Sequence, residues 1–500
     1  MSTLQVIEPS KAEVMADIPR AGAEEVDAAV ARAKAAFPDW RAVSPGDRAA
    51  LLRRLADGLE ESLEDLARLE ARNAGKPIGD ARGEIGMVVE TFRYYAGAPE
   101  RLLGQTIPVA GGVDMTFREP LGVVGLIVPW NFPLTIASWK VAPALAAGNC
   151  VVLKPAELTP LSALELERIA LAAGLPEGVL SVVAGPGSVC GQRLVEHPDV
   201  AKIAFTGSTE VGRAIRKATV GTGKKLTLEL GGKSPFVVFA DADIDGAVEG
   251  VVDAIWFNQG QVCCAGSRIL VQETIAPVFT ERLQARLAKL RVGDPLDKST
   301  DMGSLVDPVQ LARVSELVRE GAAQGAVLHQ AACALPAKGS YFAPGFFTNV
   351  APANIVSEVE IFGPVATLTT FRTPDEAVEL ANNTRYGLAA SIWSENINLA
   401  LDVAAQVKAG VVWVNATNIF DAAAGFGGYR ESGFGREGGR EGMLAYLADA
   451  PVKARAEPAP VAPDTAPHPD TPARVEGIDR TAKLYIGGAQ KRPDSGYSFA

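Results

Sequence analysis

The chain has 500 residues, of which 48% are hydrophobic and 21% charged, as in a soluble globular protein large enough for two or three domains. Its formal net charge of -11 and the lack of a basic run argue against a nucleic-acid partner. Met1–Arg20 has no secretory signal pattern, and no window approaches the ~20 consecutive apolar residues of a membrane span, so no membrane partner is expected.

The cysteine and histidine residues favour a reducing compartment and no metal site. The five cysteines are odd in number and lack metal-binding spacing, and the three histidines are scattered. We therefore expect a cytoplasmic protein without a bound metal.

The N-terminal part of the chain, residues 24–103, is predicted to be helical. Apolar residues recur at three- and four-residue spacing in Glu24–Phe37 and in Asp47–Ala74. Pro45-Gly46 separates these two helices, and Gly75-Lys76-Pro77 ends the second one.

From Leu121 the pattern changes to alternating strands and helices. The predicted strands are Val123–Val128, Cys150–Leu153, Leu180–Ala184, Ile203–Phe205 and Leu226–Leu230, with helices such as Leu161–Ala173 and Val211–Thr219 between them. This alternation is typical of a doubly wound parallel sheet. A second α/β set follows from Phe236 and includes the helix Ile275–Leu290 and the strand Val365–Phe371. A cleft between two such domains is the default place for a ligand.

Two adjacent cysteines, Cys263 and Cys264, follow a Gly-containing turn and precede the apolar run Ile269–Val271. This pattern indicates a thiol on a loop above a strand. A nucleophilic role needs a base or a positive environment, because a free thiol with a pKa near ~8.5 is mostly protonated at neutral pH. Taken alone, the pair favours the alternative of two buried, inert thiols.

Six motifs resemble those of the aldehyde dehydrogenase superfamily. Asn258–Cys263 (Asn-Gln-Gly-Gln-Val-Cys) resembles its active-site signature, and Leu228–Pro235 resembles its second signature. The other four, in the family's order, are Pro129–Pro133, Lys154–Glu157, Phe205–Ser208 and Glu360–Pro364. The resemblance spans most of residues 1–450. It implies two doubly wound parallel-sheet domains, a variant Rossmann cofactor domain and a catalytic domain, with a small β oligomerisation arm.

The resemblance also divides the chain. We expect an NAD-binding domain (1–102 and 121–232), a catalytic domain (233–431), an oligomerisation arm (103–120 and 432–452), a Pro-rich linker (453–482) and a second repeat or extra hairpin (483–500).

The expected cofactor residues do not form a Gly-x-Gly-x-x-Gly motif. Gly207 and Ser208 run from a strand into a helix whose N-terminus suits a pyrophosphate, although a plain turn with a helix cap explains them nearly as well. The family resemblance places this segment beside the dinucleotide. Lys154 and Glu157 follow a predicted strand, where a surface ion pair is the alternative. A carboxylate there can accept from both ribose hydroxyls and would repel a 2′-phosphate, which favours NAD over NADP.

The resemblance adds four further cofactor residues. Residues matching Glu360 and Phe362 hold the nicotinamide ribose and border the ring, and Pro129 and Trp130 are expected at the same site. On its own, Gly363-Pro364 predicts only a turn.

The resemblance assigns catalysis to Cys263, Glu229 and Asn131. We expect Cys263 to attack the aldehyde carbon, and the Asn131 side chain and the Cys263 backbone N–H to stabilise the oxyanion. Hydride then passes to the nicotinamide, and Glu229 is the general base for the water that hydrolyses the thioester. Its presence favours water over coenzyme A as the acceptor. Cys264 is expected to pack, since adjacent side chains of an extended segment face opposite ways.

Two of these residues also have ordinary interpretations. Asn131 lies between prolines and could be a turn residue. Glu229 could be a strand glutamate on the solvent face, whereas burial would raise its pKa to suit a base.

Substrate residues are implied by resemblance alone. The aldehyde tunnel should be lined by Phe132, Trp139, Phe257, Phe420 and Phe426. Such a tunnel implies an apolar or aromatic-tolerant substrate, although aromatic residues are more often simply core. No basic or acidic pair in the sequence indicates a charged substrate.

The C-terminal part departs from the family pattern. Phe426–Glu437 matches the family's last motif, and the Pro-rich stretch after it predicts an extended linker. Lys483–Gly488 with Arg492–Tyr497 resembles the hairpin that normally begins an aldehyde dehydrogenase, which the N-terminus near Val6 is expected to lack. This arrangement is similar to the two-repeat aldehyde dehydrogenases of family sixteen, with the chain ending inside the second repeat. A relocated hairpin that completes the first domain is the alternative.

A homodimer is expected from the same resemblance. Family members build dimers from a β-arm, here 103–120, and a C-terminal strand. Tyr446–Pro451 is predicted to be a poor strand because proline interrupts the ladder. Two other functions stay open at this point, a thiol-dependent esterase and a non-catalytic scaffold repeat of a larger protein.

Overall fold

The computed structural model describes residues 3–450, 484–486 and 489–491. Residues 1–450 form one compact unit, and residues 451–500 belong to a second. Within the described residues, no helix combines the length and the apolar character that crossing a membrane requires. The predicted linker 453–482 lies outside the described residues.

One sheet has six strands, in the order β18, β10, β9, β6, β7, β8. All neighbours are parallel except β18, which runs antiparallel to β10. The bounds are β6 Val123–Ile127, β7 Cys150–Lys154, β8 Leu180–Val182, β9 Val200–Thr206, β10 Lys225–Glu229 and β18 Gly433–Phe434. β6 and β7 are buried along their whole length, as expected of parallel strands covered on both faces. The predicted strands from Val123 to Leu230 are confirmed.

The other large sheet has seven strands, in the order β13, β14, β15, β12, β11, β16, β17. Only β13 is antiparallel to its neighbour. The bounds are β11 Pro235–Val238, β12 Arg268–Gln272, β13 Val327–Gln330, β14 Gly345–Thr348, β15 Val365–Phe371, β16 Ala389–Trp393 and β17 Val411–Val414. The sheet confirms the predicted second α/β segment, and together the two sheets confirm the expected fold class.

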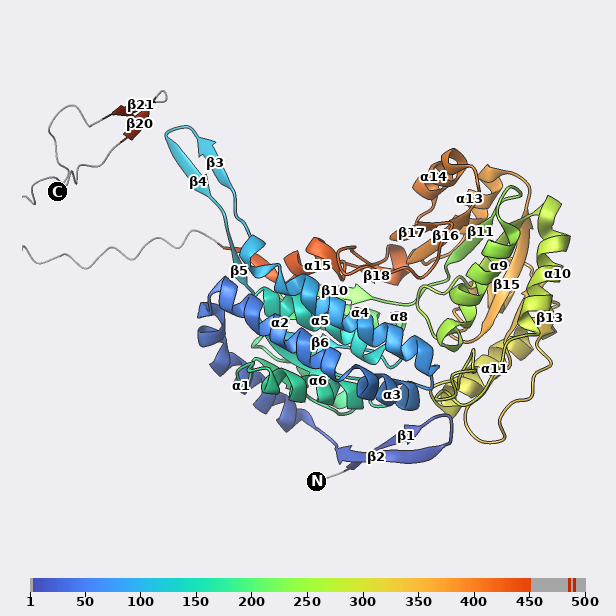
Figure 1. Ribbon diagram of the computed structural model, residues 1–500, viewed down its shortest axis with the longest axis horizontal. Coiled ribbons are helices and arrows are strands. Elements are labelled where there is room, and N and C mark those ends of the chain that lie inside the picture. Colours follow the sequence, from blue (N-terminus) through green and yellow to red (C-terminus); the bar gives the residue numbers. More distant parts are fainter. Residues whose placement is uncertain (1–2, 451–483, 487–488, 492–500) are drawn as a thin grey trace, which may run out of the picture. The chain divides into compact units, whose positions relative to one another are not determined.

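Helices pack around both sheets, α1 to α8 around the first and α9 to α14 around the second (Figure 1). Their bounds are α1 Ala23–Ala42, α2 Pro45–Glu61, α3 Leu63–Ala74, α4 Ile78–Ala96, α5 Pro133–Ala146, α6 Leu161–Ala172, α7 Gln192–Glu196, α8 Thr209–Ala218, α9 Ile244–Val251, α10 Ala276–Leu287, α11 Pro308–Ala323, α12 Ile355–Glu358, α13 Pro374–Asn382, α14 Ile397–Gln406 and α15 Gly439–Leu444. The single helix predicted for Asp47–Ala74 is wrong. The chain breaks at Ser62, which caps the end of α2 and the start of α3.

The predicted β-arm is present, and its partner strand is better than expected. β3 (Thr106–Val109) and β4 (Gly112–Met115) form a hairpin, and β5 (Phe117–Pro120) pairs antiparallel with β19 (Leu447–Ala450). The prediction of a poor C-terminal strand is wrong because the ladder ends at Ala450, before the proline. No paired residue of β19 therefore lacks its N–H.

The N-terminus carries a hairpin that the sequence was not expected to form. β1 (Thr3–Glu8) pairs antiparallel with β2 (Glu13–Pro19). Its turn places Ala12 at a φ of 56°, a conformation that Gly or Asn normally adopts, so a tight turn at an alanine was not expected. In the second unit, β20 (Leu484–Ile486) pairs antiparallel with β21 (Ala489–Lys491). A hairpin is therefore present in this segment, but its second strand comes before the predicted Arg492–Tyr497, which lies outside the described residues. Its role stays a prediction.

Candidate active site

The carboxyl ends of neighbouring strands bring the candidate residues together. Asn131 follows β6, Thr206 ends β9 and Glu229 ends β10. The carboxyl ends of parallel strands meet at one edge of a sheet, and open α/β sheets bind ligands outside that edge.

The loop that carries Cys263 is held by buried amide side chains. Asn258 and Gln259 have φ values of 46° and 58°, in the left-handed region that few residues adopt. Asn258 Nδ2 donates to the Asn131 carbonyl at 3.0 Å, and Gln259 Nε2 donates to the Ser304 carbonyl at 2.9 Å. These bonds stabilise the turn and fix the cysteine loop against the first sheet's edge.

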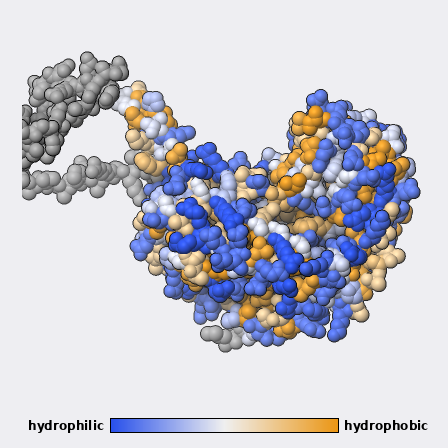
Figure 2. Space-filling view, in the orientation of Figure 1, coloured by the Kyte–Doolittle hydropathy of each residue, from blue (hydrophilic) through white to orange (hydrophobic). Residues whose placement is uncertain are grey.

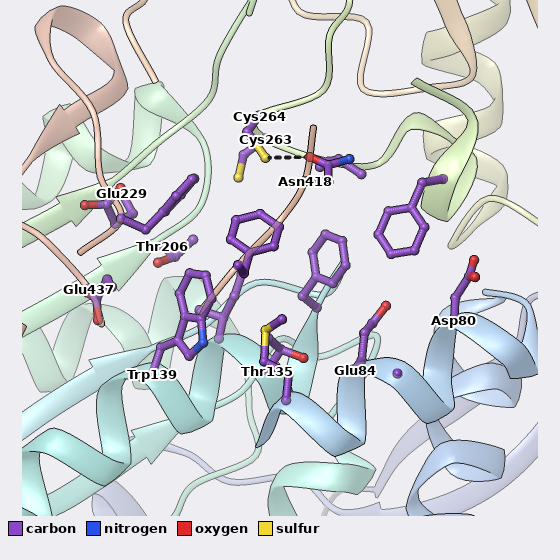
Figure 3. A pocket seen from close by; sticks show the side chains of 18 of the residues that line it. Asp80, Glu84, Thr135, Trp139, Thr206, Glu229, Cys263, Cys264, Asn418 and Glu437 are labelled. Atoms are coloured by element: carbon purple, nitrogen blue, oxygen red, sulfur yellow. Dashed lines mark hydrogen bonds between the residues drawn. The ribbon is translucent and has the colours of Figure 1, made fainter. Parts of the chain in front are cut away.

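A cavity of about 480 Å³ lies beneath this loop, and we call it the aromatic cavity. Cys263 and Glu229 line it (Figure 3). So do all the predicted tunnel residues, namely Phe132, Trp139, Phe257, Phe420 and Phe426. Trp139 packs against Phe420 and Phe426 with ring centroids 5.5 and 5.7 Å apart. The five aromatic residues therefore surround one space rather than being scattered through the core.

A second cavity, of about 440 Å³, lies at the N-terminus of α8, and we call it the α8 cavity. Among the predicted cofactor residues, those that line it are Pro129, Trp130, Gly207, Ser208, Glu360 and Phe362. Asn131 lines it as well. Cys263 and Thr206 line both cavities, so the thiol lies at their shared border.

The α8 cavity has the features of an anion site. Ser208 caps α8, as predicted, by accepting from the Val211 N–H at 3.3 Å. The first turn of α8 opens into the cavity, and Arg213, Arg313 and Arg385 also line it. Backbone N–H groups at a helix N-terminus and guanidinium groups both favour a bound phosphate.

Lys154 and Glu157 line neither of the two cavities. Lys154 ends β7 and is buried, and burial lowers its pKa. Half-buried Glu157 accepts a weak hydrogen bond from the Gly187 N–H at 3.4 Å. Among the described residues that line the two cavities, neither of them occurs.

Glu229 is a buried carboxyl group that is only 4% exposed. Neither of its oxygens has a hydrogen-bond partner among the described residues. Burial, and next the negative charge of Glu437, raise the pKa of Glu229 well above its usual range. Gly427 provides the space, because a Cβ there would lie 2.6 Å from Glu229 Oε1. A solvent-facing strand glutamate is thus excluded.

Cys263 is half-buried, and its pKa is raised above the usual range by a hydrogen bond with Cys264 and by burial. The expectation that the two side chains face opposite ways is wrong. Both lie in a turn rather than an extended segment, and both line the aromatic cavity. Cys264 does pack in the core, as expected, and its Sγ contacts Asn418 Oδ1 at 3.5 Å.

Asn131 is 3% exposed, and its Nδ2 donates to the Gln261 carbonyl at 2.8 Å. An amide nitrogen carries two hydrogens, so one remains for a ligand. The Asn131 carbonyl accepts from Lys76 Nζ at 2.9 Å. Asn131 is therefore a fixed donor that lines the α8 cavity together with Cys263.

Glu360 and Phe362 lie on the other side of the α8 cavity. Glu360 Oε1 accepts from the Gly232 N–H at 3.0 Å, and burial raises the pKa of Glu360 to about 7. Phe362 adopts a φ of 55° and meets Trp130 edge-on, with ring centroids 5.2 Å apart.

Several polar residues that line the aromatic cavity were not predicted from the sequence. They are Asp80, Glu84, Thr135, Thr206, Asp253, Asn418 and Glu437. No acidic pair was visible in the sequence because Asp80 and Asp253, which line the same cavity, are far apart in the chain. One signal existed, since Asp80 and Glu84 are four residues apart and so share a helix face.

Comparisons with known proteins identify the family. The aldehyde dehydrogenase family model matches residues 1–451. The chain is 45% identical to the mitochondrial benzaldehyde dehydrogenase of Antirrhinum majus over 450 residues, 89% of this chain and 84% of that protein. It is 46% identical to an aldehyde dehydrogenase of Enchytraeus buchholzi over 451 residues, 89% and 91% of the two chains. The solved NAD+ complex of a Bacillus cereus aldehyde dehydrogenase is similar, with a TM-score of 0.88, 41% identity and 90% and 92% coverage. The chain therefore belongs to the aldehyde dehydrogenase family.

Proposed function

We propose that this protein is a non-acylating, NAD-dependent aldehyde dehydrogenase that converts an aldehyde to a carboxylic acid. The observation that carries the proposal is the position of Cys263, which borders both the aromatic cavity with Glu229 and the α8 cavity. The test is to incubate the protein with a panel of aldehydes and NAD or NADP, and to follow NADH or NADPH by absorbance.

The residues of the α8 cavity fit NAD. Thr206 lines both cavities, and its Oγ1 is buried without a hydrogen-bond partner among the described residues. Gly207 and Ser208 at the N-terminus of α8 would hold the pyrophosphate. The nicotinamide end would be held by Pro129, Trp130, Glu360 and Phe362, and the adenine ribose by Lys154 and Glu157. When bound, NAD supplies the acceptor for the electron pair that leaves the aldehyde.

The protein's own groups perform the remaining chemistry. The Cys263 sulfur, once deprotonated, bonds to the aldehyde carbon, and the Asn131 Nδ2–H and the Cys263 backbone N–H donate to the oxygen that becomes negative. Oxidation leaves a thioester on Cys263. Glu229 removes a proton from the water that attacks this thioester, and the Cys263 thiolate departs as the acid is released.

Asn131→Ala is expected to lower kcat roughly 100- to 1000-fold, which corresponds to the roughly 2.7–4 kcal/mol that one oxyanion donor contributes. The variant also removes the shorter of the two hydrogen bonds that the Gln261 carbonyl accepts, so we expect a lower Tm as well. Steady-state kinetics and thermal unfolding separate the two effects. A kcat loss below tenfold would remove Asn131 from the mechanism and leave it a structural role.

Glu157→Gln tests the assignment of the adenosine end. The wild type is expected to prefer NAD, because a carboxylate near the ribose repels a 2′-phosphate. Removing the charge should raise kcat/KM for NADP relative to NAD about tenfold. Glu165→Gln, on the exposed surface of α6, is the matched control and should leave the ratio unchanged. An unchanged ratio in Glu157→Gln places the ribose elsewhere.

The expected domain division and the homodimer stay proposals with structural support. Residues 1–102 and 121–232, which include the six-stranded sheet, would form the NAD-binding domain. Residues 233–431 would form the catalytic domain. Exposed apolar side chains on the arm, seen as orange patches in Figure 2, support a dimer. They are Ile107, Val109, Val113, Met115 and Phe117. All five cysteines are free thiols, which supports the cytoplasm or another reducing compartment.

A further inference from the structure

The aromatic cavity has a wall that the proposed reaction does not use. Asp80 and Glu84 lie one turn apart on α4, and Asp253 comes from the turn after α9. All three line the cavity, and Figure 3 shows Asp80 and Glu84 on the opposite side of the view from Glu229. Oxidation at Cys263 and hydrolysis by Glu229 give these carboxyl groups no role.

Two of the three carboxyl groups on this wall, those of Asp80 and Asp253, lack a direct partner, whereas Glu84 pairs with Lys76. Among the described residues, the side chains of Asp80 and Asp253 have no hydrogen-bond or ion-pair partner. Glu84 Oε2 accepts from Lys76 Nζ at 2.5 Å, whereas its Oε1 is buried without a partner. No Lys, Arg or His occurs among the described residues that line the cavity. An anionic substrate would therefore be repelled here.

Thr135 gives a second and independent indication of a polar ligand. Its side chain comes from α5, which packs against α4, and is only 6% exposed. Thr135 lines the same cavity, and its hydroxyl oxygen is buried without a hydrogen-bond partner in the described part of the chain. Buried hydroxyl groups normally have a partner, so a ligand with N–H donors would satisfy this one. Figure 3 shows Thr135 near Glu84 on the same wall.

We propose that this wall binds the ammonium group of an amino aldehyde, and that the enzyme prefers ω-amino aldehydes to neutral aldehydes of equal size. The inference rests on the proposed oxidation at Cys263. Asp80 and Asp253 pair with the cation, and Thr135 Oγ1 accepts one of its N–H groups. The rings of Phe132 and Phe257, stacked with centroids 6.0 Å apart, provide apolar surface for the carbon chain.

Ionisation of Asp80 sets the conditions of the test. Burial raises the pKa of Asp80 to about 6, while Lys76 opposes the rise and Asp253 adds to it. At about pH 8 this carboxyl group is ionised, and a primary amine with a pKa near ~10 is largely protonated.

The experiment compares 3-aminopropanal with butanal and 3-hydroxypropanal, which have the same number of heavy atoms. The wild type should show a kcat/KM for 3-aminopropanal at least about tenfold above those of the two neutral aldehydes. In Asp80→Asn/Asp253→Asn, this ratio should fall about 10- to 100-fold. Asp57→Asn, an exposed position on α2, is the matched control and should keep the wild-type ratio.

Each other outcome has a defined meaning. Equal kcat/KM values for butanal and 3-aminopropanal, or an unchanged ratio in the double variant, overturn the inference alone. Equal values for 3-hydroxypropanal and 3-aminopropanal overturn the role of charge. Failure to oxidise any of the three aldehydes overturns the proposed function as well. If the double variant does not fold, exposed Asp253 is changed alone, and the ratio must still fall.

Discussion

Cys263→Ala is expected to abolish NADH formation from every aldehyde, with kcat/KM lower by roughly 10⁴-fold or more. No other thiol lies at the border between the aromatic cavity and the α8 cavity among the described residues. Without the sulfur, no thioester can form, and Glu229 has no covalent intermediate to hydrolyse. Initial rates of NADH formation and the binding of NAD measured by calorimetry separate lost chemistry from lost cofactor binding. NAD affinity should be nearly unchanged.

Cys264→Ala is the matched control, because the second thiol lines the same aromatic cavity but belongs to the core. Its removal should lower kcat/KM less than tenfold. The variant also removes the hydrogen bond that is the main cause of the raised pKa of Cys263. The pKa of Cys263 should therefore fall, and alkylation of Cys263 by iodoacetamide at a given pH should become faster. If Cys264→Ala is inactive and Cys263→Ala is active, the nucleophile has been assigned to the wrong sulfur.

The sequence predicted those parts of the fold that depend on local patterns. β6 and the first four residues of β7 are continuous apolar runs, and the strand at Val365–Phe371 was located with both ends correct. Features that depend on one backbone conformation were missed. Ser62 breaks a helical pattern that continues on both sides, and Ala12 adopts a left-handed conformation although it is neither Gly nor Asn. Apolar spacing contains no information on either position.

The candidate site shows the same division. Sequence motifs identified Cys263, Glu229 and Asn131 as site residues. In the structure, the strand ends that carry Asn131 and Glu229 and the loop that carries Cys263 meet at one edge of the six-stranded sheet. Asp80, Thr135 and Asp253 belong to no motif, and each looks like an ordinary helix or turn residue in its own segment. Only their meeting in one cavity, without partners, distinguishes them. That meeting depends on the packing of α4 against α5 and on the position of the turn after α9, which carries Asp253, and a linear sequence pattern contains neither.

The Glu229→Gln variant is expected to complete about one turnover per active site and then to stop at the thioester. Acylation of Cys263 does not require the carboxylate, so mixing with NAD and aldehyde should still give a burst of NADH close to one equivalent per active site. Hydrolysis of the thioester should be slower by roughly 10²- to 10⁴-fold, the usual contribution of a general base. Rapid mixing followed by absorbance measures the burst, and mass spectrometry of the quenched protein should detect the acyl group on Cys263.

The dependence on pH gives an independent test of Glu229. Only the ionised carboxylate can accept a proton from water, and burial and Glu437 raise the pKa of Glu229 well above the usual range. The hydrolysis rate of the wild type should therefore rise with pH through that raised pKa, whereas the rate in Glu229→Gln should lack this step. Exposed Glu61 on α2 provides the matched control, and Glu61→Gln should keep both the wild-type rate and its pH profile. A Glu229→Gln enzyme that turns over at the wild-type rate without accumulating a thioester would show that another group activates the water.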